Sequence, residues 1–71
     1  MPISRAGCWE LLKSSGAERV SEKAAAELQK VLVDLGAYIG LKARRYAQVA
    51  GRITIKAEDV RMAVEDLNLP V

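Results

Sequence analysis

The sequence predicts an all-α protein in which a long central helix stands between two short ones. Apolar residues recur at spacings of three and four along residues 21–50, as one face of a helix requires. Serines stand where the first two helices are expected to begin, and the two prolines, Pro2 and Pro70, lie outside all three predicted helices. At 71 residues, the chain is expected to form a single small domain over residues 1–71.

The first predicted helix covers residues 5–14. Ser4 is its expected N-cap, because a serine hydroxyl accepts a hydrogen bond from a free backbone N–H of the first turn. Gly16 follows its end, where glycine adopts the left-handed backbone that closes a helix. Its apolar stripe consists of Cys8, Trp9 and Leu12. Residues 17–20 are predicted to connect it to the next helix.

The second predicted helix begins after its N-cap Ser21 and continues to about Val49. One apolar stripe contains Ala24, Leu28, Val31, Leu32, Leu35, Ile39, Ala43, Tyr46 and Ala50, and a second contains Val33, Ala37 and Leu41. Gly36 and Gly40 lie near the middle, although each glycine costs a helix about 1 kcal/mol relative to alanine. The close approach of another helix explains glycines at these positions.

The length of this helix predicts a dimer. It would extend roughly 43 Å at 1.5 Å per residue, so two short helices cannot cover both apolar stripes. Soluble monomers rarely leave such a patch in water. A second chain that crosses near Gly36 and Gly40 covers it, and we expect an obligate dimer with little stable monomer. A long coiled coil is the alternative, but two glycines and the lack of a sustained heptad repeat argue against it.

The last predicted helix follows a basic loop. From Arg52 to Lys56 this loop has the form Arg-x-Thr-x-Lys, which brings two cations, a hydroxyl and backbone N–H groups together, as phosphate binding requires. Glu58 and Asp59 lie in the first turn of the helix, where carboxylates interact favourably with the helix dipole. The apolar stripe consists of Val60, Ala63, Val64 and Leu67, and residues 68–71 form a short ending.

Composition excludes several classes of protein. Apolar residues make up 51% of the chain, which is too many for a disordered tail. Cys8 is the single cysteine and there is no histidine, so we expect no internal disulfide, no zinc site or other metal centre and no activated thiol. No catalytic constellation is present, and we expect no enzyme and no cofactor. No apolar run is long enough for a membrane span or a signal peptide, which predicts a soluble intracellular protein.

The distribution of charge is more informative than the net charge of +2. Residues 1–41 contain five basic and five acidic residues, whereas residues 35–57 contain five basic residues and no acid. A solvated helix face is one explanation of the basic stretch. A surface that faces a polyanion is the other.

Two separated strings carry a resemblance to a known family. Residues 16–21 read Gly-Ala-Glu-Arg-Val-Ser, and residues 50–59 read Ala-Gly-Arg-Ile-Thr-Ile-Lys-Ala-Glu-Asp. With the order of the helices, they resemble the histone fold and, more narrowly, the small tailless archaeal histones, over residues 11–67. The resemblance implies a head-to-tail handshake dimer that bends, wraps and compacts double-stranded DNA with little sequence specificity. It also implies a cytoplasmic, nucleoid-associated protein.

The resemblance implies a DNA surface as well. Arg19 is expected to enter the minor groove, where narrow A·T-rich stretches concentrate negative potential. The Thr54 hydroxyl and Lys56 are expected to reach adjacent phosphates, and Arg5 and Lys13 are further candidate DNA-binding cations. Minor-groove arginines without base reading are the mechanism by which histone octamers wrap DNA.

Two further sites are implied by the resemblance. Arg52 is expected to form an internal ion pair with Asp59, which fixes the loop instead of touching DNA. Dimers are expected to join into tetramers or polymers through one surface. Its residues are Tyr46, Val49, Asp59 and Met62.

The chain departs from the family at several of these positions. Glu10 stands where an arginine is common, and Ile53 where a lysine is usual, which removes two DNA contacts. Tyr46 and Val49 stand where leucine and histidine are frequent, which removes a hydrogen bond to Asp59 across the dimer–dimer contact. A second function therefore stays open, namely a histone paralogue that pairs with, caps or modulates more basic histones.

Two residues of the first helix allow two explanations each. Trp9 either stacks on a base or packs in the core or the dimer, and packing is the usual role of such a residue on an amphipathic helix. Cys8 is expected to be a small buried hydrophobic residue rather than a nucleophile.

Overall fold

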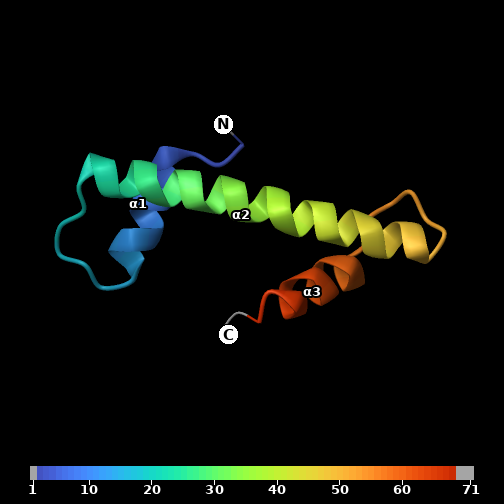
Figure 1. The fold of residues 1–71 in the computed structure, drawn as a ribbon. Helices are drawn as coiled ribbons and strands as arrows, with labels where there is room; N and C mark the ends of the chain where they lie inside the picture. The colour runs from blue at the N-terminus through green and yellow to red at the C-terminus, as the bar shows by residue number, and fades with distance from the viewer. Residues whose placement is uncertain (1, 69–71) are drawn as a thin grey trace. The chain divides into compact units, whose positions relative to one another are not determined.

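The computed structural model describes residues 2–68, which form three helices and no strand (Figure 1). Helix α1 covers Arg5–Ser14, α2 covers Glu22–Val49 and α3 covers Ala57–Asp66. The predicted all-α class and the short–long–short order are confirmed. The last three residues of the predicted ending, 69–71, lie outside the described residues.

The chain divides into two compact units, and α2 contributes to both. The first unit is Met1–Leu35 and the second is Gly36–Val71. Within the first, α1 lies beside the beginning of α2, and within the second, α3 lies beside the end of α2 (Figure 1). Among residues 2–68, no helix combines the length and hydrophobicity that crossing a membrane requires.

Local signals in the sequence explain where the helices of the first unit begin and end. The Ser4 hydroxyl accepts a hydrogen bond from the Gly7 N–H at 3.0 Å, and the Ser21 hydroxyl accepts one from the Ala24 N–H at 3.0 Å. Gly16 follows α1 with a φ of 104°, a conformation that favours glycine. Both N-caps and the closing glycine agree with the prediction.

The boundary between α2 and the second loop is also defined by the backbone. Gly51 has a φ of 74°, and its N–H donates to the Gln48 carbonyl at 2.9 Å. The Arg52 N–H donates to the Ala47 carbonyl at 2.9 Å. These bonds satisfy carbonyls that the helix end leaves without partners, and they direct the chain into the loop that carries Arg52.

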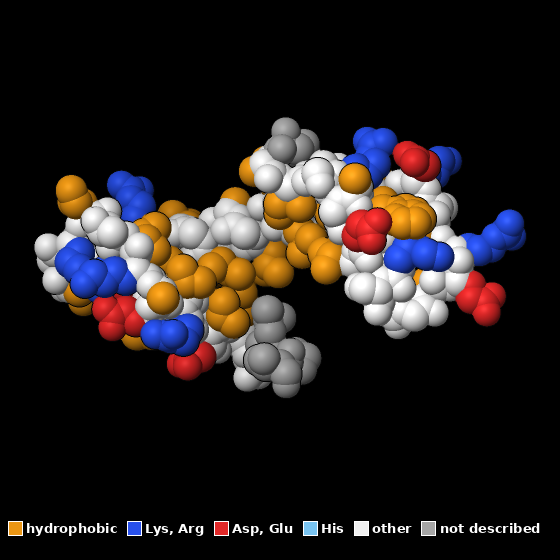
Figure 2. Space-filling view, turned by 180° about the vertical axis from the view of Figure 1, so that it is seen from behind, with side chains coloured by type: hydrophobic (Ala, Val, Ile, Leu, Met, Phe, Trp, Pro, Cys, Tyr) orange, Lys and Arg blue, Asp and Glu red, His pale blue; other side chains and the backbone are white. Residues whose placement is uncertain are grey.

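The buried core within one chain is small. The buried hydrophobic residues among residues 2–68 are all small: Cys8, Ala25, Ala43, Ala47 and Ala63. Cys8 is fully buried, as expected. No leucine, isoleucine, valine or methionine in this range is fully buried, and Figure 2 shows many hydrophobic side chains at the surface. The packing of α1 and α3 on α2 therefore uses short side chains that let helices approach closely.

The buried face of α2 differs in part from the predicted stripe. Ala25 and Ala47 are buried although the stripe omitted them, whereas Ala24, Val31 and Ala50 belong to the stripe and are exposed. The reason is that the two short helices cover only part of the apolar surface of α2. In the same way, a Cβ added at Gly36 or Gly40 would meet no atom within 4 Å, so the predicted close approach is not made within the chain.

Candidate nucleic-acid interface

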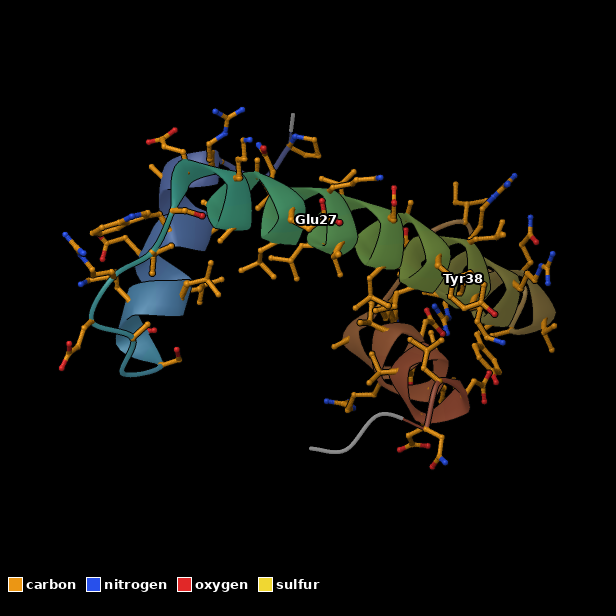
Figure 3. The ribbon with its side chains drawn as sticks, turned by 60° about the vertical axis from the view of Figure 1, so that its left-hand side comes forward. Glu27 and Tyr38 are labelled. Atoms are coloured by element: carbon orange, nitrogen blue, oxygen red, sulfur yellow. The ribbon has the colours of Figure 1, made fainter. Side chains whose placement is uncertain are left out.

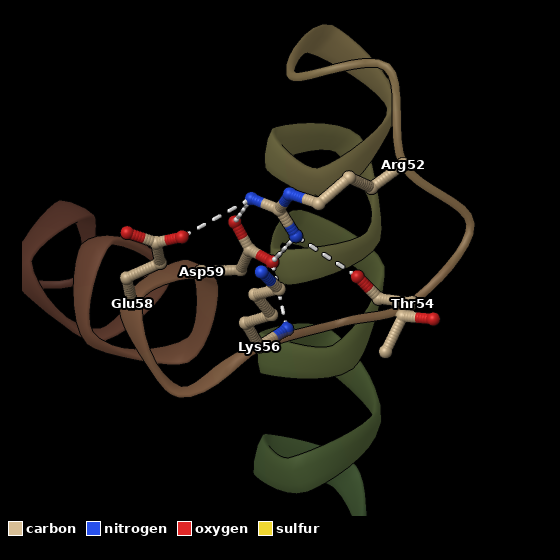
Figure 4. A network of polar contacts seen from close by, with 5 residues as sticks. All are labelled: Arg52, Thr54, Lys56, Glu58 and Asp59. Atoms are coloured by element: carbon tan, nitrogen blue, oxygen red, sulfur yellow. Dashed lines mark hydrogen bonds and ion pairs between the residues drawn. The ribbon is translucent and has the colours of Figure 1, made fainter.

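The second loop is organised around Arg52. Its guanidinium donates to both carboxylate oxygens of Asp59, with Nη1–Oδ2 at 2.8 Å and Nη2–Oδ1 at 3.0 Å (Figure 4). The same Nη1 donates to the Thr54 carbonyl at 2.9 Å, and Nη2 lies 3.4 Å from an oxygen of Glu58. A two-pronged guanidinium contact of this kind fixes direction as well as distance. Arg52 thus ties the loop to the first turn of α3.

Asp59 is the centre of this network. Its side chain is 0% exposed, and it also accepts the Lys56 backbone N–H at 2.8 Å. Hydrogen bonding from Arg52, reinforced by the Lys56 N–H, lowers the pKa of Asp59 to about 2. The hydrogen bond to Asp59 in turn raises the pKa of Arg52. Both groups are therefore charged at any pH near neutrality.

The network leaves two polar side chains of the loop on the surface. Thr54 and Lys56 are exposed, because the contacts that hold them use only their backbone carbonyl and N–H. Arg52 is directed inward, and its side chain is only 23% exposed. A hydroxyl and an ammonium on a held backbone can accept a polyanion such as the phosphates of DNA at a low cost in conformational entropy.

The first loop presents Arg19. This side chain is exposed and lies between Glu18 and Val20, whose carbonyls both accept from side chains of α1. Lys13 Nζ donates to the Glu18 carbonyl at 2.8 Å, and Trp9 Nε1 lies 3.4 Å from the Val20 carbonyl. Arg19 belongs to the first unit of the chain, whereas Thr54 and Lys56 belong to the second.

The remaining candidate cations differ in availability. Arg5 pairs with Glu22 at 3.7 Å, but both side chains are more than half exposed, so the pair is weak. Lys13 is partly buried, and its ammonium is already used in the bond to Glu18. Glu10 is exposed on the same helix.

Two arginines of α2 were not among the predicted site residues. Arg44 and Arg45 are both exposed near the end of this helix, in the stretch that contains no acid. Their neighbour Lys42 is paired with Asp66 at 3.6 Å. The acid-free stretch was the signal that identifies them, although it does not by itself distinguish a free cation from a paired one.

The predicted dimer–dimer surface changes in one respect. Val49 is 89% exposed and Met62 is 37% exposed, and the partly buried Tyr46 donates its hydroxyl to Asp66, which raises the Tyr46 pKa. Asp59, in contrast, offers no surface to another molecule, because its carboxylate is buried and both of its oxygens are occupied. This assignment of Asp59 is corrected here, and it is left out of the proposed contact.

Comparison with known proteins identifies the class to which this fold belongs. Residues 3–64 match the family described as histone-like transcription factor (CBF/NF-Y) and archaeal histone. The match covers most of the chain, including all three helices except the end of α3. The chain belongs to this family, and the resemblance found in its sequence is confirmed. Membership implies an architectural role in DNA binding, and dimerisation and DNA compaction are typical of the family.

Two curated relatives are similar over nearly their whole length. The chain is 51% identical over 64 residues to one of the subunits of archaeal histone HAN1 from Thermococcus zilligii, which covers 90% of this chain and 88% of the relative. It is 39% identical over 59 residues to probable archaeal histone 3 of Methanocaldococcus jannaschii, which covers 83% of this chain and 88% of the relative.

Proposed function

We propose that this protein is an architectural double-stranded DNA-binding protein that bends, wraps and compacts DNA as a histone-fold dimer. The observation that carries the proposal is the second loop, in which the Arg52–Asp59 pair holds the backbone while Thr54 and Lys56 stay exposed. Arg19 on the first loop supplies the proposed minor-groove contact, and exposed Arg5 adds positive charge nearby. Little sequence preference is expected, since these groups approach phosphates and groove walls rather than base edges.

The dimer is supported by the apolar surface that one chain leaves in water. Tyr38, labelled in Figure 3, is 50% exposed on α2, and Val31 and Leu41 on the same helix are 49% and 47% exposed. The chain exposes 5559 Å², whereas a folded monomer of 7.7 kDa exposes about 4,300 Å². The excess matches what one partner buries in an obligate interface.

The open space at Gly36 and Gly40 suits the same partner. No atom of the chain lies within 4 Å of a Cβ built at either glycine, so a second helix can approach the α2 backbone there. In the proposed dimer, two copies cross near these glycines and pair head to tail. Arg19 of one chain then lies beside Thr54 of the partner subunit, which gives one DNA-binding element at each end.

Further parts of the proposal follow from the dimer. Residues 1–71 would act as one histone-fold domain, because neither unit has a core of its own beyond a few small side chains. Dimers would join into tetramers or polymers on DNA through Tyr46, Val49 and Met62. The role is structural rather than enzymatic, and the proposed location is the nucleoid in the cytoplasm.

A second function is favoured by specific residues. Glu10 and Ile53 stand on the elements that should face DNA, Ile53 is fully exposed, and the net charge is only +2. The HAN1 relative is named as one of the subunits of its histone, which suggests an assembly of unlike chains for that protein. On this alternative, the chain pairs with or caps more basic histone paralogues and contributes little DNA affinity itself.

A salt titration of binding to random-sequence duplex DNA distinguishes the two functions. Phosphate-driven binding weakens linearly on a log–log plot against salt, with a slope near −0.9 for each phosphate neutralised. We expect the purified homodimer to bind duplexes of different sequence with similar affinity and a slope of several. Homodimer that binds only after a more basic histone is added would favour the alternative.

A further inference from the structure

We propose that Lys13 and Trp9 are positioning residues that hold the first loop in the conformation in which Arg19 reaches DNA. On this view, Lys13 acts through Arg19 and not by a phosphate contact of its own. The inference rests on the proposed DNA-binding function and assigns a role to two side chains of α1.

The backbone of the first loop depends on these side chains. Among the described residues, no backbone–backbone hydrogen bond involves residues 17–20. The helix ends on either side satisfy their own groups through Gly16 and Ser21. The hydrogen bonds that the structure shows to the loop carbonyls come from Lys13, to Glu18, and from Trp9, to Val20. These two carbonyls lie directly before and after Arg19 in the chain.

The two side chains also support each other. Lys13 Nζ lies 5.6 Å from the centre of the Trp9 ring, where a cation is attracted to the face of an indole. At 2.8 Å the bond from Lys13 to the Glu18 carbonyl is short and charge-assisted, while the Trp9 bond at 3.4 Å is long and weak. Lys13 is therefore the principal anchor, and Trp9 orients it.

The second loop has the same division of labour. Arg52 donates to a backbone carbonyl, that of Thr54, and is largely withdrawn from solvent, while Lys56 is exposed. In the first loop, partly buried Lys13 donates to the Glu18 carbonyl, and Arg19 is exposed. Each loop thus has one cation that holds the backbone and one that is available to a phosphate.

A double-mutant cycle with Arg19→Ala tests the inference. Lys13→Met keeps the aliphatic stem and removes the donor, and Lys30→Met removes one exposed charge from the same unit as a matched control. If Lys13 acts through Arg19, Lys13→Met should weaken binding to duplex DNA at least about threefold more than the control in the Arg19 background. In the Arg19→Ala background, the two methionine variants should bind equally. Additive losses in both backgrounds, with a salt slope lowered by about 1, would show a direct phosphate contact and overturn the proposal.

A measurement without DNA keeps the outcome independent of binding. In the free dimer, backbone amides of residues 18–20 should exchange hydrogen faster in Lys13→Met, and to a smaller extent in Trp9→Phe, which keeps an aromatic ring but lacks the N–H donor. Unchanged exchange in both variants would overturn the inference. If Arg19→Ala itself binds DNA as the wild type does, the proposed DNA surface is wrong, which is a different result.

Discussion

Arg52 and Asp59 form a two-pronged ion pair in which the carboxylate is completely buried and the guanidinium is mostly so. The pair joins a loop to the first turn of α3, and its second acceptor, the Thr54 carbonyl, extends the same contact into the loop backbone. Breaking such a pair leaves a buried charge without its partner, which costs more than a surface pair contributes. The stability of the fold and the shape of the proposed DNA surface therefore depend on the same two side chains.

Acid should weaken this pair within a defined pH range. The folded-state pKa of Asp59 is about 2, below the ordinary value of 3.8, so the ionised carboxylate stabilises the folded state. This contribution is complete above about pH 4 and is lost as the pH falls through 2. In urea unfolding at fixed protein concentration, Asp59→Asn should be less stable than wild type at neutral pH, and the difference should shrink between pH 4 and pH 2. Glu58→Gln, which alters an exposed neighbour, is the control. A difference that stays constant across this range would contradict the assignment.

Removing the cap of the long helix should have a moderate effect on stability. Ser21→Ala deletes the hydroxyl that accepts the Ala24 N–H, which should lower the free energy of unfolding by about 1 kcal/mol. Ser21→Asp should keep most of it, because aspartate is an equally good cap. Ser14→Ala is a matched serine control within α1. Equal stability of wild type and Ser21→Ala would show that the cap contributes nothing.

The dimer should be the folded species at micromolar concentration. We expect sedimentation equilibrium to give twice the chain mass, since exposed residues of α2 require a partner. Leu41→Asp should dissociate the dimer and lower the helix content together, because little stable monomer is expected. Glu27→Gln, an exposed change on the same helix (Figure 3), should leave both unchanged. A folded and stable wild-type monomer would reject the proposed dimer.

Arg19 and Lys56 should contribute sequence-independent DNA affinity. Alanine at either position should weaken binding to all duplexes by a similar factor and lower the salt slope by about 1 for each cation lost. Arg61→Ala removes an exposed cation of α3 outside the proposed surface and serves as the control. Any preference should be confined to flexible or A·T-rich duplexes that bend at lower cost. If affinity and slope stay at wild-type values in both variants, the DNA surface lies elsewhere.

Dimers should associate side by side on DNA through Tyr46 and Val49. The exposed Val49 favours an apolar contact, at roughly 25 cal/mol per Å² removed from water, and DNA should promote it by raising the local concentration of dimers. Nuclease digestion of covered DNA should give protected lengths that grow in steps, and a Tyr46→Glu, Val49→Glu variant should lose the longer ones. Binding of one dimer to a short duplex is the control and should survive. The same digestion pattern for both proteins would exclude this contact.

Much of the local structure was predictable from the sequence because its causes lie within a few residues. Ser4, Ser21 and Gly16 act on neighbouring backbone groups, so caps and a left-handed residue could be identified without any tertiary information. The periodicity of apolar residues likewise indicated the full length of α2. The pairing of Arg52 with Asp59 was implied only by the family resemblance, since periodicity does not select one acid over its neighbour.

Tertiary structure alone decided which side chains meet. The face of α2 that α1 and α3 cover determined that Ala25 and Ala47 are buried while Val31 is not. It also directed Lys13 to a loop carbonyl, and it left the carboxylate of Asp59 without exposed surface. An amphipathic helix with two apolar stripes has more than one face to bury, and local sequence does not state which neighbour arrives. The physical reason is that packing depends on the direction from which a distant segment returns, whereas capping depends on the backbone next in the chain.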